Sequence, residues 1–336
     1  MDLNIRKLAQ LAGTSYSTVS RALNDSPLVK NETKRRIQEL AQQLGYHVEF
    51  SAKSLATGMR MIVGLIYPFH SLRPYESVYT SQAIGRMRHA LTQHGLDALV
   101  AGYGSSDRAE DDITRLIRQK KVDGLIIFGY EVSEAQIESL RALGSPFLLI
   151  NPSPSTAGEL CHQIRIDHEL GGYLAGERLI GAGRRKLLSV TEVGQQFQVR
   201  AQGFHRAVAE AEHAGIGSIQ RETLTLQNGL FATAYDAIAQ NLKWVSGFDG
   251  IFVQSDISSI GVLNCLLDHG ISVPKDLSVV GYDDIEWAQY TRPALTTIHQ
   301  PVQEVAQLAT EGIVSMITGD QSELFVKQLQ PILDDR

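Results

Sequence analysis

Apolar side chains at the start of the chain recur at the spacing of short helices. The first set keeps the i, i+3, i+4, i+7 spacing of one helical face and consists of Ile5, Leu8, Ala9 and Ala12. Gly13 follows, and glycine readily takes the positive φ of a turn that ends a helix. A second set faces inward from the next helix and consists of Val19, Ala22 and Leu23. Because Thr14 or Ser15 can cap that helix, the pattern predicts two short helices joined by a tight turn.

The outward face of the second helix is polar. It carries Tyr16, Ser17, Ser20, Arg21 and Asn24. A third helix is predicted from Asn31 to Leu44, with Asn31 as its cap and Gly45 as its stop. Three short helices with one small core, the second displaying hydrogen-bond donors, are typical of a helix-turn-helix that enters a DNA major groove. An ordinary helical hairpin is the alternative that these residues alone leave open.

From Met61 the pattern changes to short apolar runs that alternate with amphipathic helices. The runs lack polar alternation, as buried strands of parallel sheets do; they are Ile62–Tyr67, Ala98–Tyr103, Gly124–Phe128, Pro146–Ile150, Leu187–Val190, Gly250–Val253 and Leu277–Gly281. Helices are predicted at Ala83–His94, Glu110–Lys120 and Ser133–Leu143. VDGLIIFG at Val122 and FDGIFVQS at Phe248 are visibly alike. The series therefore predicts two α/β lobes with parallel sheets, facing each other across a cleft of the kind that binds small molecules.

Charge separates the two parts of the chain. Up to Arg60 there are nine Lys and Arg against five Asp and Glu, a net charge of +4, and the whole chain carries −6, which leaves −10 for the remainder. A basic head on an acidic body is typical of a protein that holds nucleic acid at one end.

Composition narrows the class further. The hydrophobic content of 43% and the charged content of 20% are ordinary globular values, so long disordered stretches are not expected. Cys161 and Cys265 offer neither a disulfide framework nor a metal cluster. No apolar run of signal-peptide or membrane-span length is found, so a cytoplasmic protein is expected.

Enzymatic chemistry finds little support. GYGSSD at Gly102 lacks the third glycine of a dinucleotide fingerprint, and neither a phosphate-binding loop nor an HExxH metal motif is found. The adjacent carboxylates Asp283 and Asp284 diverge on a strand or loop, so they need not share a proton. We predict no catalytic residues, no cofactor and no metal.

Three segments resemble the lactose-repressor (LacI/GalR) family of bacterial transcription factors. They are LAQLAGTSYSTVSRALN at Leu8, LGY at Leu44 and SAKSLATG at Ser51, in this order. Farther along, LSVVGYDDIEWAQYTRPALTTIHQP at Leu277 is similar to the signature segment of that family. The resemblance implies a headpiece over residues 1–46, a hinge over 47–60 and a periplasmic-binding-protein-like body over 61–336. It places lobe 1 at about 61–159 and 293–319, and lobe 2 at about 160–290 and 322–336.

The resemblance also implies the DNA contacts. A hinge leucine of the family wedges into the minor groove, where it kinks the duplex, and Leu55 takes that place. Val48 and Glu49 stand where many members carry Pro-Asn. The DNA-binding residues are predicted to be Ser15, Tyr16, Ser17, Thr18, Ser20, Arg21, Asn24, Lys53, Ser54 and Leu55.

For the body, the resemblance places an effector in the cleft. Arg200 matches the arginine of the family that binds effector, Asp283 the strand-end acid, and Gln300 the polar residue after it. A planar guanidinium suits vicinal hydroxyls or a carboxylate. The predicted effector contacts are Phe69, Asn151, Arg200, Phe231, Ser255, Asp256, Asp283 and Gln300. Ser255 and His168 replace asparagines usual in the family, so the ligand of a relative does not transfer directly.

The resulting hypothesis is a transcriptional repressor that acts as a homodimer on a pseudo-palindromic double-stranded operator. Its expected effector is a sugar or sugar derivative, and a nucleobase or a protein corepressor stays open. No leucine heptad follows Lys327, so a dimer is expected rather than a tetramer. The protein is expected to be bacterial, nucleoid-associated when bound to DNA, and not membrane-bound. The two rival classes are a solute-binding protein, which needs export and no headpiece, and a sugar-active enzyme, which needs a nucleophile or a carboxylate pair.

Overall fold

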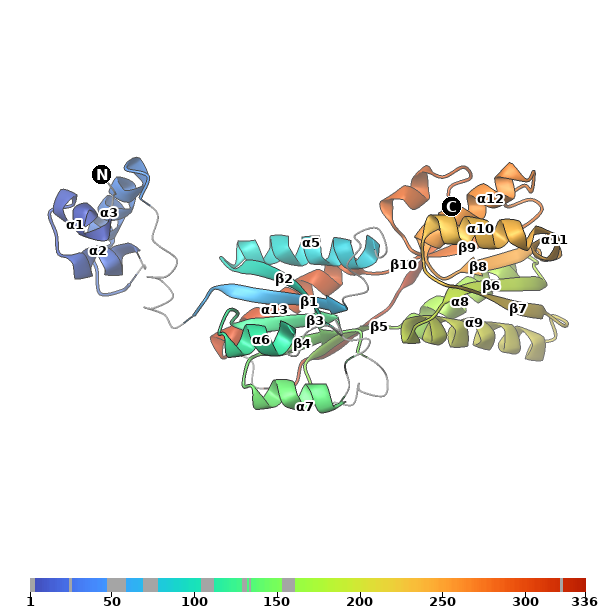
Figure 1. The fold of residues 1–336 in the computed structure, drawn as a ribbon, viewed down its shortest axis with the longest axis horizontal. Helices are drawn as coiled ribbons and strands as arrows, with labels where there is room; N and C mark the ends of the chain where they lie inside the picture. Colours follow the sequence, from blue (N-terminus) through green and yellow to red (C-terminus); the bar gives the residue numbers. More distant parts are fainter. Residues whose placement is uncertain are drawn as a thin grey trace. The chain divides into compact units, whose positions relative to one another are not determined.

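The computed structural model describes residues 4–23, 26–46, 59–68, 78–103, 112–128, 132, 134–152, 161–320 and 323–336. The chain divides into two compact units, residues 1–61 and residues 62–336. Figure 1 shows a helical first unit and a second unit built on two sheets.

The first unit contains three helices, as predicted: α1 (Ile5–Leu11), α2 (Tyr16–Leu23) and α3 (Asn31–Gln43). They share one small core that consists of Leu8, Ala9, Val19, Ala22, Val29, Ile37 and Ala41. Gly13 and Gly45 take φ values of +63° and +64°, which confirms them as the turn residues after α1 and α3. The predicted Asn31 cap is wrong. Lys30 already has the extended backbone that precedes α3, without a side-chain cap, and Asn31 is the first helical residue.

The first sheet of the body is parallel, with strand order β11-β5-β4-β3-β1-β2. Its strands are β1 (Ile62–Pro68), β2 (Asp97–Tyr103), β3 (Gly124–Phe128), β4 (Phe147–Ile150), β5 (Gln163–Ile166) and β11 (Val326–Leu329). The helices α5 (Val78–Gln93) and α13 (Val302–Thr318) cover one face, and α6 (Asp112–Arg118) and α7 (Glu134–Ala142) cover the other (Figure 1). Burial on both faces explains why its central strands are apolar throughout.

The second sheet repeats this plan with strand order β12-β10-β9-β8-β6-β7. Its strands are β6 (Lys186–Glu192), β7 (Gln220–Leu226), β8 (Gly250–Val253), β9 (Ser278–Asp283), β10 (Thr296–His299) and the antiparallel β12 (Ile332–Asp334). One face is covered by α8 (His168–Gly181) and α9 (Gln195–His213), and the other by α10 (Phe231–Gln240) and α12 (Asp256–Asp268). The short α11 (Leu242–Val245) and the 3-10 helix η2 (Glu286–Tyr290) complete this half.

All seven predicted strands are confirmed to within two residues at either end. The apolar pattern missed β7, because this edge strand exposes most of its residues, and it missed the short strands β5, β10, β11 and β12.

The strand pairing corrects the predicted lobe boundaries. β5 and β11 pair with each other in the first sheet, whereas β10 pairs with β9 in the second. The chain therefore changes sheets after β5, after β10 and after β11, some residues later than the predicted points near 160, 293 and 322. The assignment of each strand to a sheet depends on its hydrogen-bond partners, and a local hydrophobic pattern contains no information about those partners.

Candidate DNA-recognition helix and effector site

The second helix presents its polar face to solvent. Tyr16 is 52% exposed, and Ser17 and Arg21 are exposed as well. Val19 and Ala22, on the opposite face, are completely buried. The packing thus leaves the predicted base-reading side chains outward on one short helix, the arrangement that a major groove accepts.

Ser15 has a structural role in this helix. Its Oγ accepts a hydrogen bond from the backbone N–H of Thr18 at 3.1 Å, and it lies 2.9 Å from the Ser17 Oγ and 2.8 Å from the Thr18 Oγ1. Of the two predicted caps, Ser15 is therefore the one that caps α2.

Side chains of the third helix bind the ends of the first two helices. The Gln38 side chain donates to the Ala22 carbonyl at 3.3 Å, and the Arg36 guanidinium donates to the Ala12 carbonyl at 3.1 Å. Other predicted contacts lie outside the described residues: Asn24, Lys53, Ser54 and Leu55 of the DNA-binding set and Phe69 of the effector set.

Arg200 is the centre of the candidate effector site. It lies on α9, is only 4% exposed, and its Nη1 donates to the Gln254 carbonyl at 2.5 Å. Its guanidinium carbon lies 3.7 Å from the centre of the Tyr282 ring, within the range of a cation–π contact. These contacts fix an arginine at the carboxyl edge of the second sheet, since Gln254 follows β8 and Tyr282 is near the end of β9.

A close approach of α8 and α9 places Arg200 there. A Cβ at Gly172 would lie 1.8 Å from the Arg200 carbonyl oxygen, and one at Gly203 would lie 1.8 Å from the Glu169 carbonyl oxygen. Only glycine permits backbones to approach so closely. Two glycines on facing helices therefore set the depth of the arginine.

Asp283 and Gln300 complete a polar triad with Arg200. The Gln300 Nε2 donates to the Asp283 Oδ1 at 2.6 Å, and the Arg200 Nη2 lies 3.9 Å from the same oxygen. Burial raises the pKa of Asp283 to about 6, although the Arg200 charge and hydrogen bonds from Gln300 and the Asp256 backbone lower it. Asp283 also has a φ of +120°. Such backbone strain in a non-glycine residue persists where the surroundings enforce it, and it clusters at binding sites.

Asp256 lies beneath this triad. It is completely buried, and its two oxygens accept hydrogen bonds from the Thr297 hydroxyl at 2.6 Å and the Ile285 N–H at 2.9 Å. Burial and the nearby Asp283 charge hold its pKa well above its usual range. Because both oxygens already have partners in the chain, this geometry suits an organising role better than a direct ligand contact.

Glu192 is the residue that the sequence interpretation missed. It is the last residue of β6, and the Ser255 hydroxyl donates to its Oε1 at 3.4 Å. Burial raises its pKa to about 7; the Arg200 charge opposes this shift and the Asp283 charge adds to it. Its position at the end of a largely apolar strand was the available signal, as it was for Asp283.

Two further buried residues connect the triad to its surroundings. The Gln254 side chain accepts from the Thr191 hydroxyl and donates to Ser189, both at 3.1 Å, while its backbone carbonyl receives Arg200. His168 contacts the Tyr282 hydroxyl through Nδ1 at 2.9 Å. Burial and the Arg200 charge hold the pKa of His168 well below its usual value, so it is neutral.

The two remaining predicted effector contacts are Asn151 and Phe231. Asn151 is buried at the end of β4, where its Oδ1 accepts from the Ile166 N–H at 2.7 Å. Phe231 is the first residue of α10, 41% exposed and stacked on Tyr235. Contact with an effector stays a prediction for both.

The triad contains polar atoms without a partner. In the described part of the chain, the Arg200 Nε and the Gln300 Oε1 are buried and make no hydrogen bond. An unmet donor and an unmet acceptor in one buried site are costly unless a ligand or water satisfies them. The site can therefore bind hydroxyl or amino groups.

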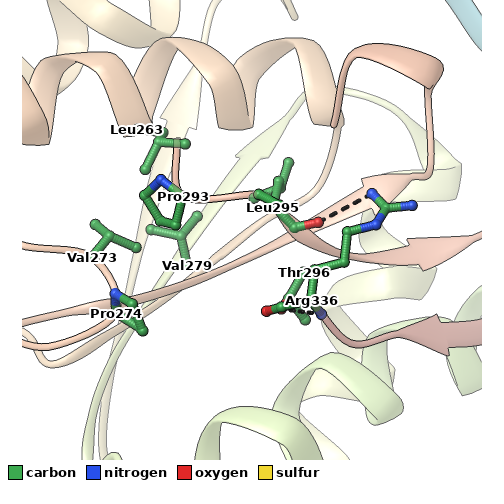
Figure 2. Close-up of a pocket in the computed structure, with 9 residues that line it drawn as sticks. Leu263, Val273, Pro274, Val279, Pro293, Leu295, Thr296 and Arg336 are labelled. Atoms are coloured by element: carbon green, nitrogen blue, oxygen red, sulfur yellow. Dashed lines mark hydrogen bonds between the residues drawn. The ribbon is translucent and has the colours of Figure 1, made fainter. Parts of the chain in front are cut away.

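A separate small pocket contains none of these residues. Its lining is largely apolar and includes Leu263, Val273, Pro293 and Arg336, as Figure 2 shows. The Arg336 Nη1 donates to the Leu295 carbonyl at 3.3 Å, which closes one side of the pocket. Its walls offer few polar groups for orienting a ligand.

The described residues contain no group of three or more His, Cys, Asp or Glu placed to hold a metal ion. None of the helices in the described part of the chain combines the length and apolar character that a bilayer crossing requires.

Known protein families match both the helical first unit and the two-sheet body of this chain. Residues 4–49 match the model of bacterial regulatory proteins of the lacI family, and residues 177–336 match that of the periplasmic binding protein-like domain. The chain is 28% identical over 335 residues to the HTH-type transcriptional repressor PurR of Vibrio cholerae, covering 99% of this chain and 96% of the relative.

Solved structures share the fold. The lac repressor dimer bound to operator and the anti-inducer ONPF superposes with a TM-score of 0.82 at 22% identity, covering 100% of this chain and 98% of that one. A LacI family transcriptional regulator from Enterococcus faecium with bound ribose has a TM-score of 0.69 at 26% identity, covering 82% and 97%.

A helix-turn-helix unit followed by a periplasmic-binding-protein-like body defines a class, the DNA-binding transcriptional regulators. The chain combines a helix-turn-helix domain that matches the lacI family of bacterial regulatory proteins with a periplasmic binding protein-like domain, and it is similar over nearly its whole length to a repressor of this class. Members of the family regulate transcription and are not enzymes.

Proposed function

We propose that the protein is a transcriptional repressor whose hold on operator DNA is controlled by a small polar effector at the Arg200–Asp283–Gln300 triad. The observation that carries the effector assignment is the pair of buried atoms without partners, the Arg200 Nε and the Gln300 Oε1. The name of the Vibrio cholerae relative, a repressor, supports the direction of control.

In this proposal α2 reads the operator. Arg21 is suited to a guanine edge, and Tyr16 and Ser17 supply further donors to neighbouring bases. The functional unit is a homodimer on a pseudo-palindromic site, because one short helix reads only half of such a site. The dimer of the lac repressor on its operator supports this assembly.

A carbohydrate is the effector class that we favour. The Arg200 guanidinium can hold two adjacent hydroxyls, while the Gln300 Oε1 can accept a third hydroxyl proton. The ribose held by the Enterococcus faecium regulator supports this class.

Gln300 is the residue through which effector binding would change the arrangement of the two sheets. This residue lies between β10 of the second sheet and α13, which packs on the first. A ligand that binds Gln300 in one arrangement of this segment and not in another shifts the population toward the first. The shift is limited by the difference between its affinities for the two states.

The test uses the full chain. An operator is first selected from random duplexes, and its affinity is measured by fluorescence anisotropy. Sugars, polyols and purines are then screened by thermal melting, where a ligand at a hundred times its Kd adds about 2.7 kcal/mol. We expect Arg200→Ala to keep operator binding and lose the ligand response. Arg206→Ala, an exposed arginine of the same helix, serves as the control and should keep both.

A normal ligand response in Arg200→Ala would remove the triad from the effector site. Failure of the wild-type protein to select any DNA sequence would contradict the regulatory function itself.

A further inference from the structure

Glu192 occupies a place in the effector site that the triad does not explain. It ends β6, next to β8 in the sheet, and Ser255 at the cap of α12 donates to it. Its carboxylate interacts electrostatically with Arg200 and with Asp283. Strands β6 and β9 of the second sheet and helix α9 thus bring two carboxylates and one guanidinium together.

The glycine loop before α10 confines the Glu192 carboxylate. A Cβ at Gly229 would lie 2.5 Å from its Oε1 and 2.7 Å from its Oε2. The carboxylate therefore lies directly against the backbone at Gly229. A group held this closely acts as a positioned contact rather than a mobile surface charge.

The charges of this site do not balance. Glu192 and Asp283 provide two carboxyl groups, against the single guanidinium of Arg200. His168 adds no positive charge, because burial and Arg200 keep it neutral. A partly buried carboxylate without a cation is costly. The pKa of Glu192 is raised because burial disfavours its charged form.

Arg200 does not neutralise both acids. Its Nη1 is engaged by the Gln254 carbonyl, and its Nη2 lies 3.9 Å from Asp283. The Arg200 Nε is a buried donor and the Gln300 Oε1 a buried acceptor without a partner, and the Glu192 carboxylate interacts electrostatically with the same arginine. This set matches a ligand that carries hydroxyls and one positive charge.

We propose that Glu192 is a specificity-determining residue and that its carboxylate binds a protonated amine of the effector. The effector is thus a polyhydroxylated amine, such as an aminated sugar, and phosphorylated or carboxylated sugars are excluded by the two acids. This inference rests on the proposed effector site and specifies its ligand class.

The probes are matched sets of monosaccharides. For each aldohexose and aldopentose, the parent sugar is compared with its amino, N-acetylamino and phosphate derivatives by thermal melting and calorimetry on the full chain. We expect an amine to bind, and its N-acetyl and phosphate counterparts to bind much more weakly or not at all.

Two variants separate a contact from a structural role. Glu192→Gln keeps the shape of the side chain and should weaken amine binding by roughly 30-fold, since it removes one partner of a desolvated charge pair. Glu222→Gln changes an exposed carboxylate on the neighbouring strand β7 and should leave amine affinity unchanged.

Proton release provides a readout that folding defects do not imitate. At pH 6.5 most Glu192 is protonated in the free protein, because its pKa is about 7. Arg200 and Asp283 are the charged groups that act on it, from α9 and β9. Binding of an amine must remove that proton, so calorimetry in two buffers of different ionisation enthalpy should show proton release by the wild type and much less by Glu192→Gln.

Each other outcome counts against the proposal. Binding of a neutral sugar without preference for its amine, with the response lost in Arg200→Ala, would overturn the role of Glu192 and leave the effector site intact. Binding of a phosphate would overturn the exclusion of anions. Silence toward every amine would overturn the inference, and silence toward every probe with operator binding intact would also remove the small-molecule effector from the proposed function.

Discussion

The candidate recognition helix α2 and the candidate effector site use similar side chains in opposite environments, because the first exposes them to solvent and the second buries them. On α2, Tyr16 and Arg21 stand in solvent on a helix held by a small apolar core. In the body, Arg200 and Asp283 are almost completely withdrawn from water, with side-chain exposures of 5% and 14%. An arginine is free to meet a base in the first case and is fixed by Tyr282 and Gln254 in the second.

This difference shows which interactions support DNA recognition on α2 and which support ligand recognition in the body. Exposed DNA-reading side chains need only a rigid helix beneath them, so their positions depend on the stability that the helix cap and the small core provide. Buried ligand-binding side chains need a partner for every neighbouring polar group, because an unpaired charge is far more costly in the interior than at the surface. Substitutions in the two regions should therefore have different signatures.

The largest effect is expected from Asp256→Ala. This change leaves the Ile285 N–H and the Thr297 hydroxyl without acceptors in a completely buried place, which should cost the body about 3 kcal/mol of unfolding free energy. Urea denaturation measures it. Asp97→Ala, at an exposed position, is the control and should stay within about 0.5 kcal/mol. A loss below about 1 kcal/mol in Asp256→Ala would mean that the buried network is not what holds the site.

The next effect concerns DNA alone. Arg21→Ala should weaken specific operator binding by about 2 kcal/mol, roughly 30-fold, because a bidentate contact to guanine is removed. The melting temperature of the body should not change. Arg35→Ala on α3, whose side chain is 83% exposed and paired with Glu39, should leave the sequence preference intact. Equal operator affinities for Arg21→Ala and the wild type would remove Arg21 from base recognition.

A smaller effect is expected from the cap of the recognition helix. Ser15→Ala removes the acceptor of the Thr18 N–H and should destabilise the headpiece by about 1 kcal/mol. Amide hydrogen exchange along α2 measures this loss, with Ser17→Ala as the matched control. Protection of α2 that does not decrease would show that the core alone determines its stability.

A further effect is a dependence on pH that only the buried site should have. Glu192 titrates near 4.5 when unfolded and at about 7 when folded, so between these values the folded state binds more protons. Its contribution to stability is present in full below about pH 4.5 and is lost as pH rises toward 7. Glutamine does not titrate, so the melting temperature of Glu192→Gln relative to the wild type should rise between about pH 5 and pH 8.

Taking the difference between the two proteins cancels other titrations, including that of Asp284, whose pKa is lowered chiefly by its hydrogen bond with His299. A constant difference across this pH range would mean that Glu192 is not buried beside Asp283.

The sequence by itself determined the parts whose signals are local. The spacing of Leu8, Val19 and Ile37 predicts the headpiece helices, Gly13 and Gly45 mark its turns, and unbroken apolar runs predict the central strands of both sheets. These signals can be read along the chain because helices and buried strands impose their own periods on it.

Tertiary structure alone decided which sheet contains β5, β10 and β11, the structural role of Asp256 and the place of Glu192 in the candidate effector site. Each depends on partners far away in sequence: β5 pairs with β11, Asp256 accepts from Thr297, and Glu192 lies against Gly229. The charge state and exposure of a carboxylate follow from what surrounds it in space. Residue order records which acids the chain possesses, and folding decides which of them meet Arg200.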